Sequence, residues 1–274
     1  MVASSATIVK NKGEIMCHSE KIAEHEILEN RKIAENYYLM TLKCAHLKKA
    51  QPGQFYMLSP EKSHHFLSRP ISLFSQKANG DLQFYYFTKG SGTFELSHMK
   101  PGEKMIAQGP LGNSFIKHKS PLLLVGGGVG LAPFYELIES RRETMSFELL
   151  AGARTSTGLE ILKEFKAISP DIEQSIYEAT DDGSVGMKGF VTELLVQRLA
   201  VKHFGAVFVC GPTPMMKAVA KICRDRGIQC FVSLEEAMAC GVGACVGCSI
   251  ETPTGMKRVC KEGPIFDATE VFYE

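Results

Sequence analysis

The sequence predicts an N-terminal antiparallel β-barrel, then a doubly wound parallel-sheet α/β domain, then a small cysteine-rich module. Three observations support this fold class. Short runs of β-forming residues fill 21–118, apolar strands alternate with amphipathic helices over 119–234, and four of the nine cysteines lie in 235–274. Residues 1–20 show none of these patterns, and we expect them to form an N-terminal arm.

The composition is that of an ordinary globular protein and excludes several classes. The chain has 274 residues, of which 45% are hydrophobic and 22% charged, enough for two domains. A formal net charge of +1 gives no electrostatic reason to expect a nucleic acid partner. No apolar run reaches the ~18 residues of a membrane helix, and the N-terminus lacks the apolar core of a signal peptide. We therefore expect a cytoplasmic protein without a membrane partner.

The barrel is predicted from strand-like segments that are rich in aromatic and β-branched residues and bounded by Pro and Gly. These segments are NYYLMTLKC (36–44), GQFYMLS (53–59), LQFYYFT (82–88) and EKMIAQ (103–108). One helix is predicted at TFELSHMK (93–100), after the turn KGSG.

The α/β domain begins with PLLLV (121–125), a continuously apolar run typical of a central parallel strand. Further strands are predicted at SFELLAG (146–152), IEQSIYEA (172–179), AVFVCG (206–211) and, as the last of the sheet, IQCFVS (228–233). Helices are predicted at 131–142, 158–168, 190–200 and 213–227. Ser233 is then expected to cap a short helical turn in SLEEAM.

The C-terminal cysteines follow the spacing C-x4-C-x2-C-x11-C. Structural zinc sites usually pair two short knuckles, whereas this spacing is typical of a plant-type 2Fe–2S site. Gly241, Gly243 and Gly247 are expected to take positive φ angles, so that backbone N–H groups turn towards the sulfides. The pattern favours a 2Fe–2S cluster, with zinc or unligated cysteines as the alternatives.

Two motifs in the barrel suit anionic ligands but are weak when read singly. In SRPISLFS, a proline fixes the backbone after Arg69, so the guanidinium suits a phosphate, and the Ser72 hydroxyl suits a ring nitrogen. GSGTFEL leads a glycine turn into a helix start at Thr93, which is a ready anion site. Read alone, each motif is more often an ordinary structural turn.

Two motifs in the α/β domain suit a dinucleotide. VGGGVGLAP follows a buried strand and precedes a helix, although residue 131 is Leu where the G-x-G-x-x-G fingerprint has its third glycine. VFVCGPTPMM ends another strand at the carboxyl edge, where open α/β sheets bind ligands. The residues that we assign to NAD are Gly126, Gly127, Gly128, Gly130, Cys210, Gly211 and Pro212.

In this order the four motifs resemble the ferredoxin–NADP reductase superfamily, in which a β-barrel binds flavin and an α/β domain binds the nicotinamide cofactor. SLEEAMACGVGACVGCSI and VCKEGPIF are similar to the electron-transfer subunits of class 1B (NAD-dependent) dihydroorotate dehydrogenase. The resemblance spans roughly 21–270, and the segment before the last cysteine is shorter than in the family pattern. It implies a 2Fe–2S cluster on Cys240, Cys245, Cys248 and Cys260. It implies FAD bound by Arg69, Pro70, Ile71, Ser72, Tyr85, Tyr86, Phe87, Gly92 and Thr93.

The resemblance also implies a role in pyrimidine biosynthesis. An FMN-containing partner oxidises dihydroorotate, and this chain relays the electrons through 2Fe–2S and FAD to NAD+, in a heterotetramer with two copies of each subunit. Two alternatives stay open. One is the flavin and 2Fe–2S subunit of an NADH-dependent ferredoxin:NADP oxidoreductase or sulfide dehydrogenase; the other is a zinc-bearing, non-catalytic nucleotide-binding protein. Arg154 follows the second strand of the α/β domain and does not settle NAD against NADP.

Overall fold

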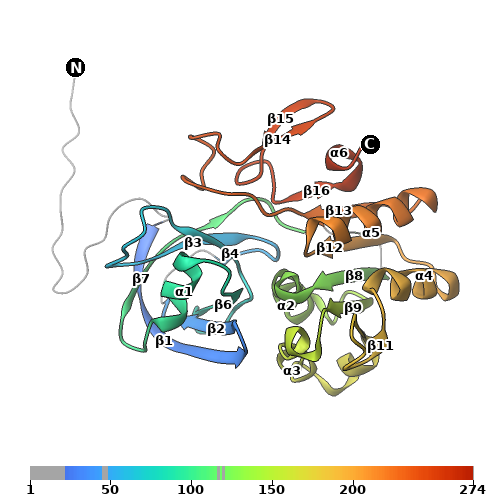
Figure 1. Ribbon diagram of the computed structural model, residues 1–274, viewed down its shortest axis with the longest axis horizontal. Coiled ribbons are helices and arrows are strands. Elements are labelled where there is room, and N and C mark those ends of the chain that lie inside the picture. Colours follow the sequence, from blue (N-terminus) through green and yellow to red (C-terminus); the bar gives the residue numbers. More distant parts are fainter. Residues whose placement is uncertain (1–21, 45–48, 116–117, 119–120, 274) are drawn as a thin grey trace.

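The computed structural model describes residues 22–44, 49–115, 118 and 121–273, so the predicted N-terminal arm lies outside the described residues. Figure 1 shows the barrel on the left, the α/β domain on the right, and the C-terminal segment along the top of both. Among the described residues, no helix is long and apolar enough to cross a bilayer.

The N-terminal domain is a seven-stranded antiparallel sheet in the order β4-β3-β7-β1-β2-β6-β5, and it curls so that β4 approaches β6. Alternate side chains such as Met40, Tyr56 and Phe84 are buried inside it. Helix α1 starts at Ser91, two residues before the predicted start. The elements are β1 (Ile22–Ala34), β2 (Tyr37–Leu42), β3 (Phe55–Pro60), β4 (Arg69–Ser72), β5 (Ser75–Gln76), β6 (Leu82–Phe87), α1 (Ser91–His98) and β7 (Lys104–Leu111).

The second domain is a mostly parallel sheet in the order β11-β10-β9-β8-β12-β13-β16. Apolar side chains of α2 and α3 cover one face of the sheet, and those of α4 and α5 cover the other, as a doubly wound fold requires. The strands are β8 (Leu122–Gly127), β9 (Phe147–Ala153), β10 (Ile176–Thr180), β11 (Met187–Lys188), β12 (Ala206–Cys210) and β13 (Cys230–Ser233). The helices are α2 (Ala132–Arg141), α3 (Leu162–Lys166), α4 (Val191–Val201) and α5 (Thr213–Asp225), with 3-10 turns η1 (Gly128–Leu131), η2 (Ser156–Leu159) and η3 (Pro170–Ser175).

Two expectations about the end of this domain are wrong. β13 is not the last strand, because β16 (Ile265–Asp267) pairs with it in antiparallel fashion at the edge of the sheet. Ser233 does not cap a helical turn, because it remains in β13 and the N–H of Leu234 donates to the Pro264 carbonyl at 2.8 Å. Pairing with a distant segment thus outweighs the local capping signal.

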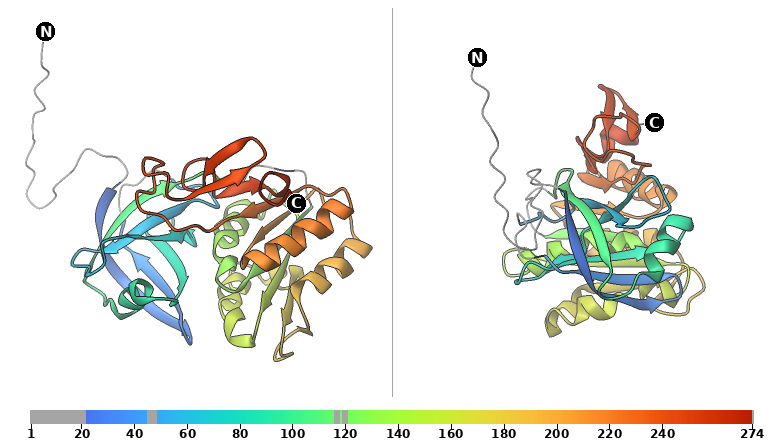
Figure 2. Two further views of the ribbon diagram at one scale, coloured as in Figure 1. Left: turned by 45° about the horizontal axis from the view of Figure 1, so that its top comes forward. Right: turned by 90° about the vertical axis from the view of Figure 1, so that its left-hand side faces the viewer.

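The C-terminal segment contacts both domains, and the left view of Figure 2 shows it lying across them. Besides β16 it forms the hairpin β14 (Ser249–Thr252) and β15 (Gly255–Arg258) and the short helix α6 (Ala268–Val271). The Asn113 side chain, just after the last barrel strand, donates to the carbonyls of Glu262 and Ile265 at 2.9 and 2.8 Å. The segment is therefore fastened to the barrel as well as to the α/β sheet.

The barrel and the α/β domain also pack directly against each other. The rings of Phe74 and Tyr135 stack with centroids 4.1 Å apart. Beside them, the carboxylate of Glu136, which is only 4% exposed, accepts a hydrogen bond from the Gln76 N–H at 2.9 Å. Burial raises the pKa of Glu136 to about 7, with a smaller contribution from the negative charge of Glu139 and an opposing one from the Gln76 N–H. A buried carboxyl group thus lies at the contact between the domains.

Candidate functional site

The two anion-binding motifs of the barrel meet in space. The guanidinium of Arg69, at the start of β4, lies so close to Gly92 that a Cβ at Gly92 would occupy the same space. The Thr93 hydroxyl accepts hydrogen bonds from the N–H groups of Lys89 and Gly90, at 2.9 and 3.2 Å, and fixes the start of α1. A guanidinium held beside a helix N-terminus offers both charge and N–H donors, which is the donor set that a pyrophosphate needs.

The aromatic residues of β6 divide between two sides of the strand. Tyr86 points into the barrel, where its hydroxyl donates to Asn30 at 2.9 Å, so only its backbone is available to a ligand. Tyr85 belongs to the core shared with the α/β domain, and its buried hydroxyl has no hydrogen-bond partner among the described residues. Burial also raises its pKa. A buried phenol without a partner fits a site that receives a polar ligand atom.

The two dinucleotide motifs also come together. β8 and β12 are neighbours, and a Cβ at Gly130 would collide with the backbone of Cys210. Gly127 likewise leaves room for Pro212 and Met215. The glycine loop and the Cys-Gly-Pro loop therefore pack against each other at the carboxyl edge of the sheet. The strand order also reverses here: β9, the next strand after β8, lies on one side of β8, and the later strand β12 lies on the other side.

Two charged groups at this edge were not predicted. Glu235 follows β13 and lies within electrostatic reach of both Cys210 and Lys89. Part of its surface is open to solvent, but protein atoms crowd the carboxyl closely enough that desolvation raises its pKa, while the charge of Lys89 lowers it. Burial keeps the Cys210 thiol neutral by raising its pKa. A position directly after a strand at the carboxyl edge was the signal that could have pointed to Glu235.

The four clustered cysteines lie as two neighbouring pairs. Cys240 interacts with Cys245, and Cys248 with Cys260, while the charge of Cys240 also reaches Cys260. The first pair is accessible to solvent, and the second is buried. The Cys245 N–H, with those of Val242 and Ala244, is directed at the Cys240 sulfur and lowers its pKa to about 6. Backbone donors aimed at sulfur suit thiolates that bind a metal cluster.

The hairpin β14–β15 explains how a short connection brings Cys260 to the other cysteines. Thr252 and Gly255 close the hairpin, and the Val259 N–H then donates to the Cys248 carbonyl at 3.0 Å. The Cys260 N–H consequently lies 3.4 Å from the Cys248 sulfur. Because the hairpin leads the chain away from Cys248 and back to it, the short segment between Cys248 and Cys260 still brings Cys260 next to Cys248.

The loop around the cysteines differs from its predicted backbone at one glycine. Gly241 and Gly243 have φ of 68° and 81°, as expected, but Gly247 does not have a positive φ. Val246 takes a φ of 53° instead, which costs a β-branched residue conformational energy. Within the part of the chain that the structure describes, no three His, Cys, Asp or Glu side chains form a group suited to one metal ion.

The cysteine loop is packed on the barrel next to the flavin motif. A Cβ at Gly241 would lie 2.7 Å from the side chain of Met57 in β3 and 3.0 Å from that of Leu111. Met57 in turn pairs with Pro70 of β4 in the antiparallel ladder. The cysteines therefore lie one strand away from the Arg-Pro-Ile-Ser motif.

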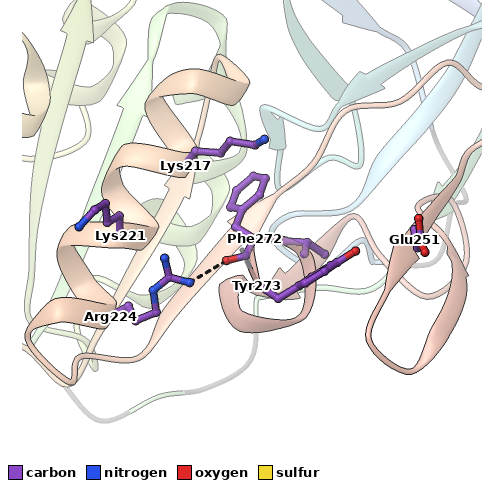
Figure 3. Close-up of a pocket in the computed structure, with 7 residues that line it drawn as sticks. Lys217, Lys221, Arg224, Glu251, Phe272 and Tyr273 are labelled. Carbon is purple, nitrogen blue, oxygen red and sulfur yellow. Dashed lines mark hydrogen bonds between the residues drawn. The ribbon is translucent and has the colours of Figure 1, made fainter.

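A further pocket, of about 330 Å³, lies between α5 and the C-terminal residues (Figure 3). Each of its cationic side chains has a partner: Lys217 lies over the Phe272 ring, Arg224 donates to the Phe272 carbonyl, and Lys221 pairs with Asp225. None of the predicted site residues lines this pocket. Its contacts fasten the C-terminus to α5, and we assign it no ligand.

Comparisons with known proteins agree with this arrangement. The model for the iron-sulfur cluster binding domain of dihydroorotate dehydrogenase B matches residues 235–272, and the model for an oxidoreductase NAD-binding domain matches residues 124–221. The dihydroorotate dehydrogenase B (NAD(+)) electron transfer subunit of Clostridium perfringens is 36% identical, over 90% of this chain and 96% of its own length. The corresponding subunit of Geobacillus thermodenitrificans is 37% identical, over 89% of this chain and 96% of its own length.

A solved structure of another oxidoreductase is also similar to this chain. A chain of the NADH-dependent reduced ferredoxin-NADP oxidoreductase structure matches with a TM-score of 0.79 and 32% identity, and the match covers 91% of this chain and 90% of that one. Together with the curated relatives, this likeness covers both domains and the cysteine-rich segment. The chain therefore belongs to the family of electron transfer subunits of NAD-dependent dihydroorotate dehydrogenase B.

Proposed function

We propose that this chain relays electrons from a dihydroorotate-oxidising FMN subunit to NAD+, through a 2Fe–2S cluster and FAD. The observation that carries the proposal is the contact between the cysteine loop and β3, the partner strand of the flavin motif. It puts the predicted cluster ligands and the predicted flavin ligands on neighbouring backbone. Bound flavin exchanges a hydride with nicotinamide and single electrons with an iron–sulfur cluster, which is the conversion that such a relay requires.

On the barrel, the chain holds and orients FAD. Arg69 and the first turn of α1, with Gly92 and Thr93, bind the pyrophosphate. Pro70, Ile71 and Ser72, which are half-buried, and the strand from Tyr85 to Phe87 border the ring system. Tyr85 supplies the partnerless hydroxyl.

On the α/β domain, the chain holds NAD over the carboxyl edge. The backbone of the glycine loop, from Gly126 to Gly130, receives the phosphates, and the loop from Cys210 to Pro212 borders the nicotinamide. Glu235 and Lys89 place one negative and one positive charge beside that edge. When Glu235 is ionised, these two charges orient the ligand, although desolvation of the carboxyl group favours its protonated form and the charge of Lys89 opposes that effect.

In the C-terminal segment, the sulfurs of Cys240, Cys245, Cys248 and Cys260 hold the cluster. The solvent-accessible pair, Cys240 and Cys245, faces outward and gives a partner access to the cluster. We propose a cytoplasmic heterotetramer with two copies of each subunit. We assign no dihydroorotate site to the described residues, and the proposal gives that oxidation to the partner.

A second function is favoured by one observation. The 32% identical chain comes from an NADH-dependent reduced ferredoxin-NADP oxidoreductase, so a role with ferredoxin and NADP is the alternative. The curated relatives that are 36% and 37% identical are dihydroorotate dehydrogenase B subunits, which favours the dihydroorotate function.

Purification with the native partner separates the two functions. The proposal predicts co-purification with an FMN-containing subunit and NAD+ reduction that depends on dihydroorotate, while the isolated chain leaves dihydroorotate unchanged. A complex that reduces NADP+ with reduced ferredoxin, and ignores dihydroorotate, would establish the alternative.

A further inference from the structure

Tyr37 reaches from the barrel over the edge of the α/β sheet. It is the first residue of β2, and Cβ atoms added at Gly128 and Gly158 would lie 3.4 and 3.3 Å from its hydroxyl. Gly128 directly follows β8, and Gly158 lies in η2, shortly after β9. The phenol therefore lies over the carboxyl ends of two neighbouring strands, where open α/β folds bind their ligands.

The ring of Tyr37 is held in place while its hydroxyl is left without a partner. It stacks on Tyr85, with centroids 5.7 Å apart and an interplanar angle of 15°, and its centroid is 4.8 Å from that of Phe87. Among the described residues, the hydroxyl makes no hydrogen bond. A fixed ring with an unused donor at the carboxyl edge of the sheet is suited to contact a ligand rather than to close the core.

The surroundings of the hydroxyl select an anionic ligand group. Arg154, just after β9, lies within electrostatic reach of Tyr37 and is exposed. Burial raises the pKa of Tyr37 and the charge of Arg154 lowers it, so the phenol keeps its proton and acts as a donor at neutral pH. Gly128 has a φ of 55° and no side chain, which lets a ligand approach the backbone closely.

We propose that the Tyr37 hydroxyl donates a hydrogen bond to a phosphate oxygen of the nicotinamide dinucleotide, with Arg154 supplying positive charge beside it. This inference rests on the proposed function and deepens it. Because the same ring stacks on Tyr85 of β6, Tyr37 links the proposed dinucleotide site of one domain to the proposed flavin site of the other.

The test compares Tyr37→Phe with Tyr38→Phe in the full chain carrying its native cofactors. Tyr38 is the matched control because it is the next residue of β2 and stacks on Tyr86 on the opposite side. Binding of NAD+, ADP-ribose and adenosine is measured by calorimetric titration, and thermal unfolding is measured alongside. ADP-ribose retains the pyrophosphate, whereas adenosine has no phosphate.

We expect Tyr37→Phe to lower the affinity for NAD+ and for ADP-ribose about tenfold, because one hydrogen bond to a charged group is lost. The affinity for adenosine should be unchanged. Tyr38→Phe should bind all three as the unmodified chain does. Unchanged ADP-ribose binding in Tyr37→Phe, or an equal loss for adenosine, overturns the inference while the proposed function stands. If the unmodified chain binds neither NAD+ nor ADP-ribose, the proposed function itself fails.

Discussion

Substituting Gly92 by alanine should expel Arg69 from the flavin site. Gly92 lies in the first turn of α1 and has no positive φ, so alanine is tolerated by the backbone and even favoured by helix propensity. The added Cβ, however, falls within the Arg69 guanidinium, which must move away. The perturbation is therefore a displaced charge rather than a strained backbone.

The magnitude follows from the contact that is lost. A charge-assisted hydrogen bond between guanidinium and phosphate contributes about 1.5–3 kcal/mol, so FAD should bind roughly ten- to a hundredfold more weakly. The assay is titration of the flavin-free chain with FAD, followed by quenching of flavin fluorescence. The flavin content of the purified protein should fall in parallel.

Gly90→Ala is the matched control for this prediction. Gly90 precedes the same helix, has an extended backbone with φ of −148°, and has no atom within 4 Å of an added Cβ. It should retain FAD affinity close to that of the unmodified chain. Equal losses in both variants, or full affinity in Gly92→Ala, would refute the assignment of Arg69 to FAD.

The other predictions concern the domain contact and the cysteine loop. Glu136→Gln should raise the free energy of unfolding above pH 7 by up to roughly 3 kcal/mol and leave it unchanged below pH 4.5. The reason is that the pKa of Glu136 is about 7 in the folded protein, so the unmodified protein becomes less stable as the pH rises between these values and the buried carboxyl group ionises. Urea titrations across this pH range measure the difference. Cys260→Ser should remove iron and its absorbance while FAD stays bound, and iron retained at the normal ratio would argue against this ligand. Gly241→Ala should slow electron transfer between flavin and cluster in stopped-flow experiments, because its Cβ pushes the loop off Met57, whereas Gly227→Ala, at a similar positive φ but with no atom nearby, should not.

The parts of the fold that were predictable depend on short-range patterns. The continuous apolar run before the glycine loop and the alternation of strands and helices over 119–234 reflect burial on both faces of a parallel sheet. The cysteine spacing is also local, and in the structure the four residues lie as two neighbouring pairs. The apolar run and the cysteine spacing are each complete within about 20 residues, and each strand or helix of the alternation is predicted from its own short segment, so no long-range knowledge is needed.

The parts that were missed depend on contacts between distant segments. β16 joins the sheet at β13, which removes the need for the helical turn at Ser233. Tyr37 and Glu235 reach the site only because the barrel and the C-terminal segment dock at the edge of the α/β sheet. Val246 takes the positive φ that was expected at Gly247, which local propensity would not choose. Tertiary packing decides each of these cases.

The most direct test of the relay is an anaerobic titration of the isolated chain with NADH, followed by visible absorption and electron paramagnetic resonance. The relay predicts that NADH bleaches the flavin and that the signal of a reduced 2Fe–2S cluster then appears in the same molecules. A chain whose flavin is reduced while no iron–sulfur signal develops, even with dithionite, or a colourless chain with stoichiometric zinc, would contradict it.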